Sequence, residues 1–121
     1  MKGGIHVNFN TSEKDGVVIV IPLGRILDGP DTNRLQGKIE EFVRIGARRM
    51  VIDLGEVPHM DSSGIRILVS ALNRLRKEGG ELRLARITDK VEDLIAITQL
   101  TEKFKTYASV EEAVLDFPSN N

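Results

Sequence analysis

Residues 51–75, VIDLGEVPHMDSSGIRILVSALNRL, contain the pattern that decides how this chain folds. Residues 51–54 form a short apolar run that is typical of a buried strand. Residues 55–60 predict a loop, because they include glycine and proline, which break regular structure. From Ser62 onward apolar residues recur at helical spacing, so a helix with one buried face is predicted. These apolar residues are Ile65, Leu68, Val69, Leu72 and Leu75.

Two hydroxyl groups, those of Ser62 and Ser63, stand at the start of this predicted helix. The first N–H groups of a helix lack partners within the helix, and the helix dipole is positive there. An anion attached to either serine would therefore be tolerated by the protein itself. The alternative is simple capping, in which Asp61 or Ser62 accepts hydrogen bonds from these N–H groups. Because capping needs only one residue, the two roles are compatible.

The composition limits the classes of function. A length of 121 residues fits one domain over 1–121, with 118–121 as a tail. The chain has no cysteine and its two histidines lie far apart, so we expect neither a disulfide nor a metal site. A net charge of −1 gives no reason to expect binding to nucleic acid or membrane. No apolar run is long enough to cross a bilayer, and residues 1–4 lack the apolar part of a secretory signal. We therefore expect a cytoplasmic protein without cofactors.

The rest of the chain alternates strand and helix patterns. Residues 5–9 alternate apolar and polar side chains, which predicts a half-buried strand. Residues 11–16 are polar and end in Asp15-Gly16, a hairpin signal, so the strand over 17–21 should be antiparallel to the first. Further on we expect a helix between Pro30 and Gly46, a strand over 49–54 and the helix from Ser62 to about Glu78. A strand around Leu82 and Leu84 and a helix capped by Asp89 should follow. The chain should then form a strand over 104–107 and a helix over 110–117, which starts at the capping box of Ser109 and Glu112. This order predicts an α/β domain.

The motif Asp61-Ser62-Ser63-Gly64, placed between the apolar strand and the helix, resembles the phosphorylation loop of STAS domains. That family includes the bacterial anti-sigma factor antagonists. The resemblance extends to residues 23–28, 79–84 and 100–104. It implies a single STAS-like domain with a mixed sheet of four to five strands and about four helices, the main helices being packed on one side.

The resemblance also implies a function. In the family the second hydroxyl of the motif accepts a phosphate, which points here to Ser63, with Ser62 as the second choice. The chain would be an anti-sigma factor antagonist, a regulatory binding module and not an enzyme. Unphosphorylated, it would bind an anti-sigma factor serine kinase; phosphorylated, it would be released, and a serine phosphatase would reset it. Whether it forms a homodimer is left open.

Five residues are expected to shape this loop or face the partner: Asp28, Asp61, Ser62, Gly64 and Arg66. Asp28 has an alternative role as the N-cap of the first helix, and the gap between Gly24 and Asp28 is one residue longer than is usual in the family. Asp61 could equally form a local turn. Arg66 could pair with a phosphate or be an ordinary exposed residue. Asp53 lies on the strand predicted over 49–54, and we expect it to be a buried carboxylate bonded to nearby loop backbone.

Three other functions are alternatives to this interpretation. A constitutive STAS subunit of a transport or signalling complex would keep the fold without a phosphate switch. A hydrolase would use His59 as the base, but neither serine lies in a glycine-flanked nucleophile elbow. A phospho-aspartate receiver would use Asp53, but the ends of the first two strands lack the acidic pair that such domains need.

Overall fold

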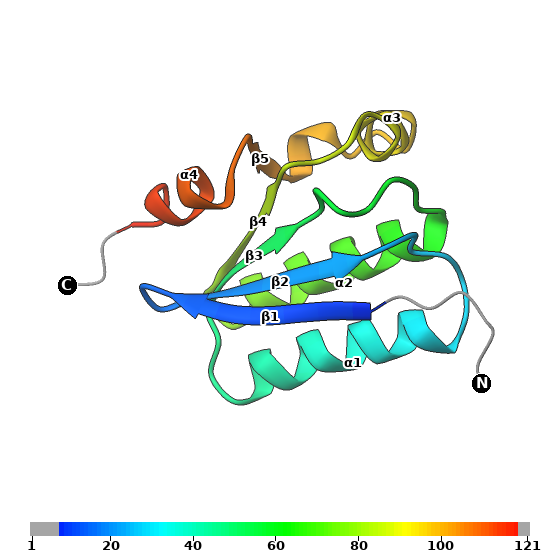
Figure 1. Ribbon diagram of the computed structural model, residues 1–121. Coiled ribbons are helices and arrows are strands. Elements are labelled where there is room, and N and C mark those ends of the chain that lie inside the picture. Colours follow the sequence, from blue (N-terminus) through cyan, green and yellow to red (C-terminus); the bar gives the residue numbers. More distant parts are fainter. Residues whose placement is uncertain (1–7, 119–121) are drawn as a thin grey trace.

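The computed structural model describes residues 8–118 and contains a five-stranded sheet with the strand order β1-β2-β3-β4-β5 (Figure 1). Along the chain the elements are β1 (Asn8–Lys14), β2 (Val17–Leu23), α1 (Pro30–Arg44), β3 (Arg49–Asp53), α2 (Ser62–Lys77), β4 (Glu81–Ala85), α3 (Asp89–Ile97), a 3-10 turn η1 (Thr101–Lys103), β5 (Lys105–Tyr107) and α4 (Val110–Leu115). β1 is antiparallel to β2, and the other neighbouring strands are parallel. The predicted α/β fold with a mixed sheet is confirmed.

The first two strands form a hairpin. Asp15 and Gly16, which connect them, both have positive φ angles, 54° and 79°, as a two-residue hairpin turn requires. The prediction of a polar loop over 11–16 was wrong for residues 11–14, which belong to β1 and pair with β2. β1 lies at the edge of the sheet, so its polar side chains stay in water while its backbone completes the ladder. Residues 5–7 of the predicted first strand lie outside the described residues.

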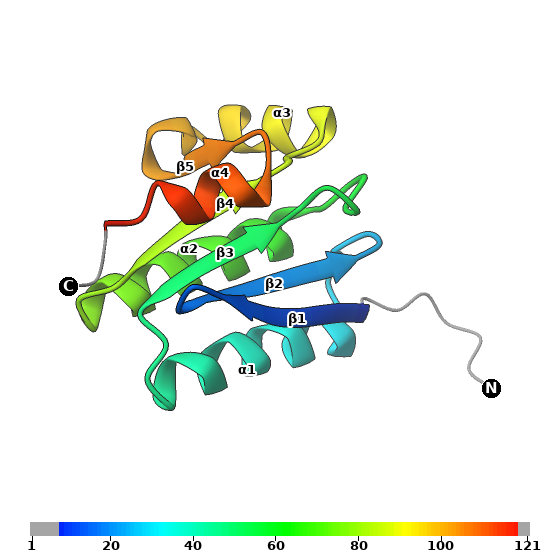
Figure 2. The same ribbon diagram turned by 60° about the vertical axis from the view of Figure 1, so that its left-hand side comes forward.

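Helices cover both faces of the sheet, as Figure 2 shows. α1 and α2 pack on one face, where they meet the alternate apolar residues of β2, β3 and β4: Val18, Val20, Met50, Ile52, Leu82 and Leu84. The prediction that the main helices lie on one side is thus confirmed. α4 covers part of the opposite face, where Ala113 and Val114 contact Val51 and Ala85. α3 adds Val91 and Ile95 to the larger core, the one that α1 and α2 cover.

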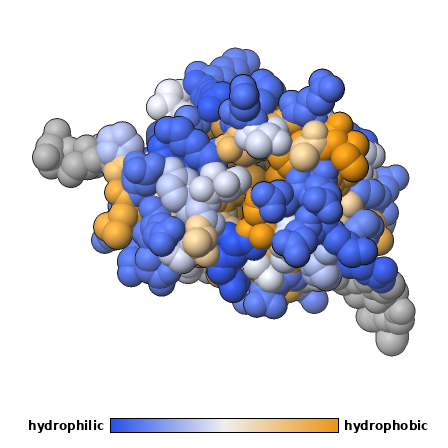
Figure 3. All heavy atoms as spheres, turned by 90° about the horizontal axis from the view of Figure 1, so that it is seen from above, coloured by the Kyte–Doolittle hydropathy of each residue, from blue (hydrophilic) through white to orange (hydrophobic). Residues whose placement is uncertain are grey.

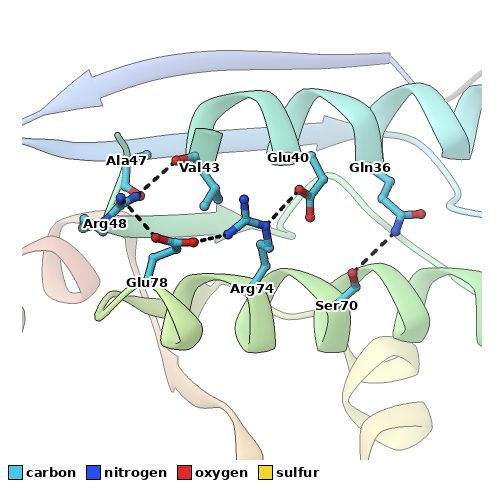
Figure 4. Close-up of polar contacts among 8 residues, drawn as sticks. All are labelled: Gln36, Glu40, Val43, Ala47, Arg48, Ser70, Arg74 and Glu78. Atoms are coloured by element: carbon cyan, nitrogen blue, oxygen red, sulfur yellow. Dashed lines mark hydrogen bonds and ion pairs between the residues drawn. The ribbon is translucent and has the colours of Figure 1, made fainter. Parts of the chain in front are cut away.

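A polar chain also ties α1 to α2 (Figure 4). Arg74 of α2 donates to Glu40 of α1 at 3.1 Å and to Glu78 at 2.8 Å. Glu78 in turn lies 3.5 Å from Arg48, which donates to the carbonyl oxygens of Val43, at the end of α1, and of Ala47, just after it. Each exposed pair contributes only about 0.2–1 kcal/mol. The chain therefore aligns the two helices more than it stabilises them, and the apolar core supplies most of the stability.

The short helix α4 is held by a buried cation. The side chain of Arg83 in β4 is 6% exposed and donates to Asp116 at 3.1 Å. Its guanidinium also lies 4.2 Å from the centre of the Phe117 ring and 5.8 Å from that of Tyr107. The hydroxyl of Tyr107 also donates a hydrogen bond to Asp116. These contacts explain how a helix of six residues docks on the sheet.

The helix ends follow most of the predicted signals. α1 starts at Pro30 and stops before Gly46, whose φ is 117°. Ser109 caps α4 by accepting the N–H of Glu112 at 3.1 Å, as predicted. The structure corrects two other expectations. Thr88, one residue before Asp89, is the N-cap of α3. α4 ends at Leu115, before the predicted position 117, because Phe117 turns back to pack against the core.

The surface on the α3 and α4 side is mixed. Ile97 in α3 and Leu115 in α4 are 77% and 79% exposed. Figure 3 looks down on this side and shows hydrophobic areas separated by hydrophilic residues. Single exposed apolar side chains are normal on protein surfaces, so they need no partner to explain them. Among the described residues, no helix combines the length and apolar character needed to cross a membrane.

We predict opposite effects for two glycine-to-alanine substitutions. A Cβ atom at Gly80 would lie 2.2 Å from the backbone oxygen of Arg48, where β3 and β4 begin to pair, so Gly80→Ala should destabilise the fold by about 1–3 kcal/mol. Gly37 is an exposed position inside α1 with nothing within 4 Å of its Cβ position, so Gly37→Ala should stabilise by about 0.5–1 kcal/mol. Urea unfolding measures both; equal effects would contradict the steric argument.

Candidate functional site

The candidate site lies where the loop after β2 meets the loop after β3. Ile26 and Met60 form an isolated parallel bridge between these loops. Around it, Ile26 N–H donates to the carbonyl of His59 at 3.1 Å, and Asp61 N–H donates to the carbonyl of Ile26 at 3.1 Å. The segment around Asp28 therefore lies beside the start of α2.

Asp61 joins the two loops through its carboxylate. It is the N-cap of α2, and its Oδ1 accepts the N–H of Ser63 at 2.8 Å. Its Oδ2 accepts the N–H of Asp28 at 3.2 Å. The capping role considered for Asp61 is thus confirmed. Asp28 is not the N-cap of α1, because that position belongs to Gly29, which has no side chain to cap with.

The hydrogen bonds determine the charge state of Asp61. Partial burial raises the pKa of the Asp61 carboxyl. Hydrogen bonds from the N–H groups of Ser63 and Asp28 and from the Ser63 hydroxyl lower this pKa, and together they outweigh the effect of burial. The net result is a pKa below the usual value for an aspartate. Asp61 is therefore firmly ionised at neutral pH, at a helix end where the dipole favours negative charge.

The two serines of the motif have different environments. Ser62 is exposed, whereas Ser63 is buried, with only 4% of its surface exposed. The helical spacing explains this difference, since Ser63 lies on the same stripe of α2 as the buried Ile67 and Ala71. Ser62 lies one turn before the exposed Arg66. The same periodicity in the sequence distinguishes the two hydroxyls, since position 63 falls on the apolar stripe and position 62 does not.

Gly64 lets the loop close tightly on the helix. A Cβ atom at this position would lie 2.7 Å from the sulfur and 2.9 Å from the Cβ of Met60. Met60 is itself only 2% exposed. A side chain at position 64 would push Met60 out of the core, so the glycine of the motif is required for packing.

The remaining predicted residues lie at the surface. Asp28, Arg66 and His59 are exposed. The backbone carbonyl of His59 accepts the N–H of Ile26 from the neighbouring loop. Arg66 lines a shallow groove along α2 together with Ser62, Ile65 and Val69. Within residues 8–118, no three histidine, aspartate or glutamate side chains gather closely enough to hold a metal ion.

An ion pair that the sequence analysis missed supports the loop from the other side. Asp53 is buried and accepts the N–H of Gly55 at 3.0 Å, as expected for a structural carboxylate. It also binds Arg86 through two hydrogen bonds of 2.9 Å and 3.1 Å. In addition, Thr88 donates its hydroxyl to the carbonyl of Val57 at 2.8 Å. The signal in the sequence was weak: Arg86 directly follows a strand that runs parallel to the one Asp53 ends.

Comparison with known proteins gives consistent results. Residues 8–113 match the sequence model of the STAS domain. A protein named as an anti-sigma factor antagonist, BtrV of Bordetella bronchiseptica, is 28% identical over 103 residues, which cover 85% of this chain and 88% of that protein. A crystal structure described as that of an anti-sigma factor antagonist from Thermotoga maritima superimposes with a TM-score of 0.83 at 25% identity, covering 89% of this chain and 92% of that one.

Bacillus SpoIIAA, an anti-sigma factor antagonist, shares the fold in both forms in which it was solved. The unphosphorylated form has a TM-score of 0.77 at 20% identity, and the phosphorylated form has a TM-score of 0.72 at 18% identity. Each covers 88% of this chain, and the aligned parts make up 93% and 96% of the two SpoIIAA chains.

The Asp53–Arg86 pair predicts a specific stability pattern. Arg86→Met leaves the buried Asp53 carboxylate with the Gly55 N–H as its remaining hydrogen bond, and should cost about 1–3 kcal/mol. Combining it with Asp53→Asn should recover part of this loss, because a neutral amide still accepts the N–H and needs no cation. Lys90→Met on the exposed side of α3 is the control, expected within about 0.5 kcal/mol. Urea unfolding measures the free energy of unfolding of each variant. If the loss in the double variant equals the sum of the losses in the two single variants, the coupling between Asp53 and Arg86 is contradicted.

The lowered pKa of Asp61 predicts a pH dependence. A carboxyl whose pKa is lower in the folded than in the unfolded state stabilises the fold above the unfolded value, about 3.9 for aspartate. This contribution is lost as the pH falls through the folded pKa. The wild type should therefore be more stable than Asp61→Asn at pH 7, and the difference should shrink between about pH 5 and pH 2. Urea unfolding at several pH values tests this, and a difference that stays constant would contradict it.

Proposed function

This chain belongs to the STAS domain family, and we propose that it acts as an anti-sigma factor antagonist. Unphosphorylated, it docks on an anti-sigma factor that is a serine kinase and frees the sigma factor. Phosphorylation at Ser63 by that kinase ends the interaction, and a serine phosphatase restores it. The cycle takes place in the cytoplasm, and the chain itself contributes binding and not catalysis.

The observation that carries this proposal is the joined pair of loops at the start of α2. Asp28 in the first loop is bonded to the Asp61 cap, and Ser62 and Arg66 follow that cap in the first turns of α2; all three are exposed to a partner. The names of relatives support the same role, since BtrV is named as an anti-sigma factor antagonist. SpoIIAA, which has this fold, exists in a phosphorylated form, so a protein of this architecture can carry phosphate.

The charge added by phosphate explains how binding would end. A phosphoserine carries about −1.5 to −2 charges near neutral pH. At position 63 it would lie next to the Asp61 carboxylate and close to the loop of Asp28, where negative charge is already present. A partner surface fitted to the unmodified site would then meet repulsion and a desolvation cost. A coupling of about 3 kcal/mol weakens binding more than a hundredfold.

The test uses a cognate anti-sigma kinase with ATP, followed by mass-spectrometric mapping of the modified residue. Ser62→Ala should still be phosphorylated, whereas Ser63→Ala should not. Ser63→Asp should bind the kinase at least tenfold more weakly than the wild type, because it introduces part of the charge of the phosphate.

Two outcomes would contradict the switch. One is the absence of phosphate at both serines, and the other is undiminished binding of a folded Ser63→Asp variant. The burial of Ser63 is the observation that favours the rival, a STAS subunit without a phosphate switch. For that rival, both Ser63→Ala and Ser63→Asp would bind the partner like the wild type.

A further inference from the structure

The groove along α2 carries positive charge that the domain leaves uncompensated. The lining side chains from α2 include Ile65, Arg66, Val69, Asn73 and Lys77. The acid in the lining, Glu40 of α1, is paired with Arg74, which also lines the groove. In the described part of the chain, neither Arg66 nor Lys77 forms an ion pair. The groove therefore favours a partner that brings negative charge.

The side chains of α2 that face this groove follow one another at a regular spacing. Val69, Asn73 and Lys77 are each four residues apart, so they form a row on one side of the helix, with a rise of about 6 Å from one to the next. Val69 is half-buried, and Asn73 and Lys77 are exposed. A helix that lies in the groove therefore meets an apolar group first, then an amide, and then a cation.

The outer side of α3 has a row of the same spacing. Asp89, Asp93 and Ile97 are also four residues apart, and all three are exposed, Ile97 to 77%. Within residues 8–118, neither of the two aspartates is part of an ion pair. This row therefore ends in an apolar group on one side and carries two free carboxylates on the other.

Laid antiparallel in the groove, the row of α3 matches the row of α2 in chemistry as well as in spacing. Each contact joins two apolar groups, a hydrogen-bond acceptor and a donor, or an anion and a cation. The three matched pairs are Ile97 with Val69, Asp93 with Asn73, and Asp89 with Lys77.

The helix α4 shows that the spacing selects α3, because α4 has similar chemistry without this spacing. Its last residue, Leu115, is 79% exposed, and its first turn contains two glutamates. However, α4 starts at Val110, so it has no residue eight positions before Leu115, where α3 has Asp89 before Ile97. With its exposed leucine in place of the isoleucine, α4 would not reach the cation at the far end of the groove.

We propose that the groove along α2 is a docking site for α3 of a second copy of this chain. In Figures 1 and 2, α3 lies on the opposite side of the molecule from α1, whereas Glu40 of α1 lines the groove, so the contact joins two copies and not two parts of one. The two patches differ, so the contact is heterologous and leaves one groove and one α3 free in each pair. One short helix buries little surface, so the association is weak and rises with protein concentration. The inference goes beyond the proposed function and does not depend on it.

Disulfide trapping tests the contact directly, because the chain contains no cysteine. Full-length Val69→Cys is mixed with full-length Ile97→Cys in the presence of oxidised glutathione, and the mixed dimer is quantified by mass spectrometry. The control partner is Leu115→Cys, whose position is exposed to the same degree and likewise ends an acidic helix. Both rates are corrected for the reactivity of each exposed thiol toward glutathione. Because docking raises the effective concentration of the matched thiols, they should cross-link at least about tenfold faster than the control pair.

Charge reversal tests the register of the two helices. Lys77→Glu, placed in the copy that carries the thiol at position 69, should slow cross-linking about fivefold, and Asp89→Lys in the other copy should then restore the rate. Lys14→Glu makes the same charge change on the edge strand β1, outside the contact, and should have no effect. Raising the salt concentration from about 0.1 M to 1 M shortens the Debye length from about 10 Å to 3 Å, and should also slow the reaction.

Equal cross-linking by the thiols at positions 97 and 115 would overturn the proposal and leave the groove to a partner other than a second copy. An equal loss of rate in Lys77→Glu and Lys14→Glu would also overturn it, because the effect would then come from net charge alone. So would a failure of Asp89→Lys to restore the rate, with circular dichroism showing that each variant is folded. The assay contains no kinase, so its outcome is separate from that of the phosphorylation mapping.

Discussion

Three parallel strands that end at the same edge of the sheet are the constraint on which the site depends. β2, β3 and β4 are hydrogen-bonded neighbours, so the loops that leave their carboxyl ends must share one small region. Ligand and partner sites commonly lie at this edge of α/β sheets. In this protein two carboxylates link the neighbouring loops by accepting hydrogen bonds across them. Asp61 connects the loops after β2 and β3, and Asp53 connects the loops after β3 and β4 through Arg86.

The parts of the fold with strong periodicity could be predicted from the sequence. The helix opened by Ser62, the β-branched strand predicted over 17–21 and the Asp15-Gly16 hairpin each follow from local patterns. The extent of β1 could not, because an edge strand buries little and its polar side chains look like those of a loop. Apolar periodicity identifies only elements with a buried face, so it does not predict strand residues that pair with their neighbour through backbone hydrogen bonds alone.

The site was predictable by residue type but not by contact. The cap at Asp61 follows from its position before the helix, since few residue types accept N–H groups there. The Arg86 pair with Asp53 joins residues far apart in sequence, and only the strand register brings them together. The role of Asp28 depends on its backbone N–H, which every residue except proline possesses. Because a backbone N–H is common to nearly all residue types, the sequence does not indicate which N–H bonds to Asp61. Only the structure identifies Asp28 as that partner.

The charges around Ser63 favour a switch that acts on a partner rather than on the fold. The Ser63 N–H, which could hold a phosphate at the helix start, already donates to Asp61. Arg86, which supports the same loop from its other side, is paired with the buried Asp53. A phosphate at this position would therefore add its charge to an acidic surface with little compensation from within the domain. The apolar core below does not depend on this charge, so the proposed modification would alter the start of α2, where Ser63 is buried, and leave the sheet in place. A protein that docks at the start of α2 would then distinguish the two states without any rearrangement of the sheet.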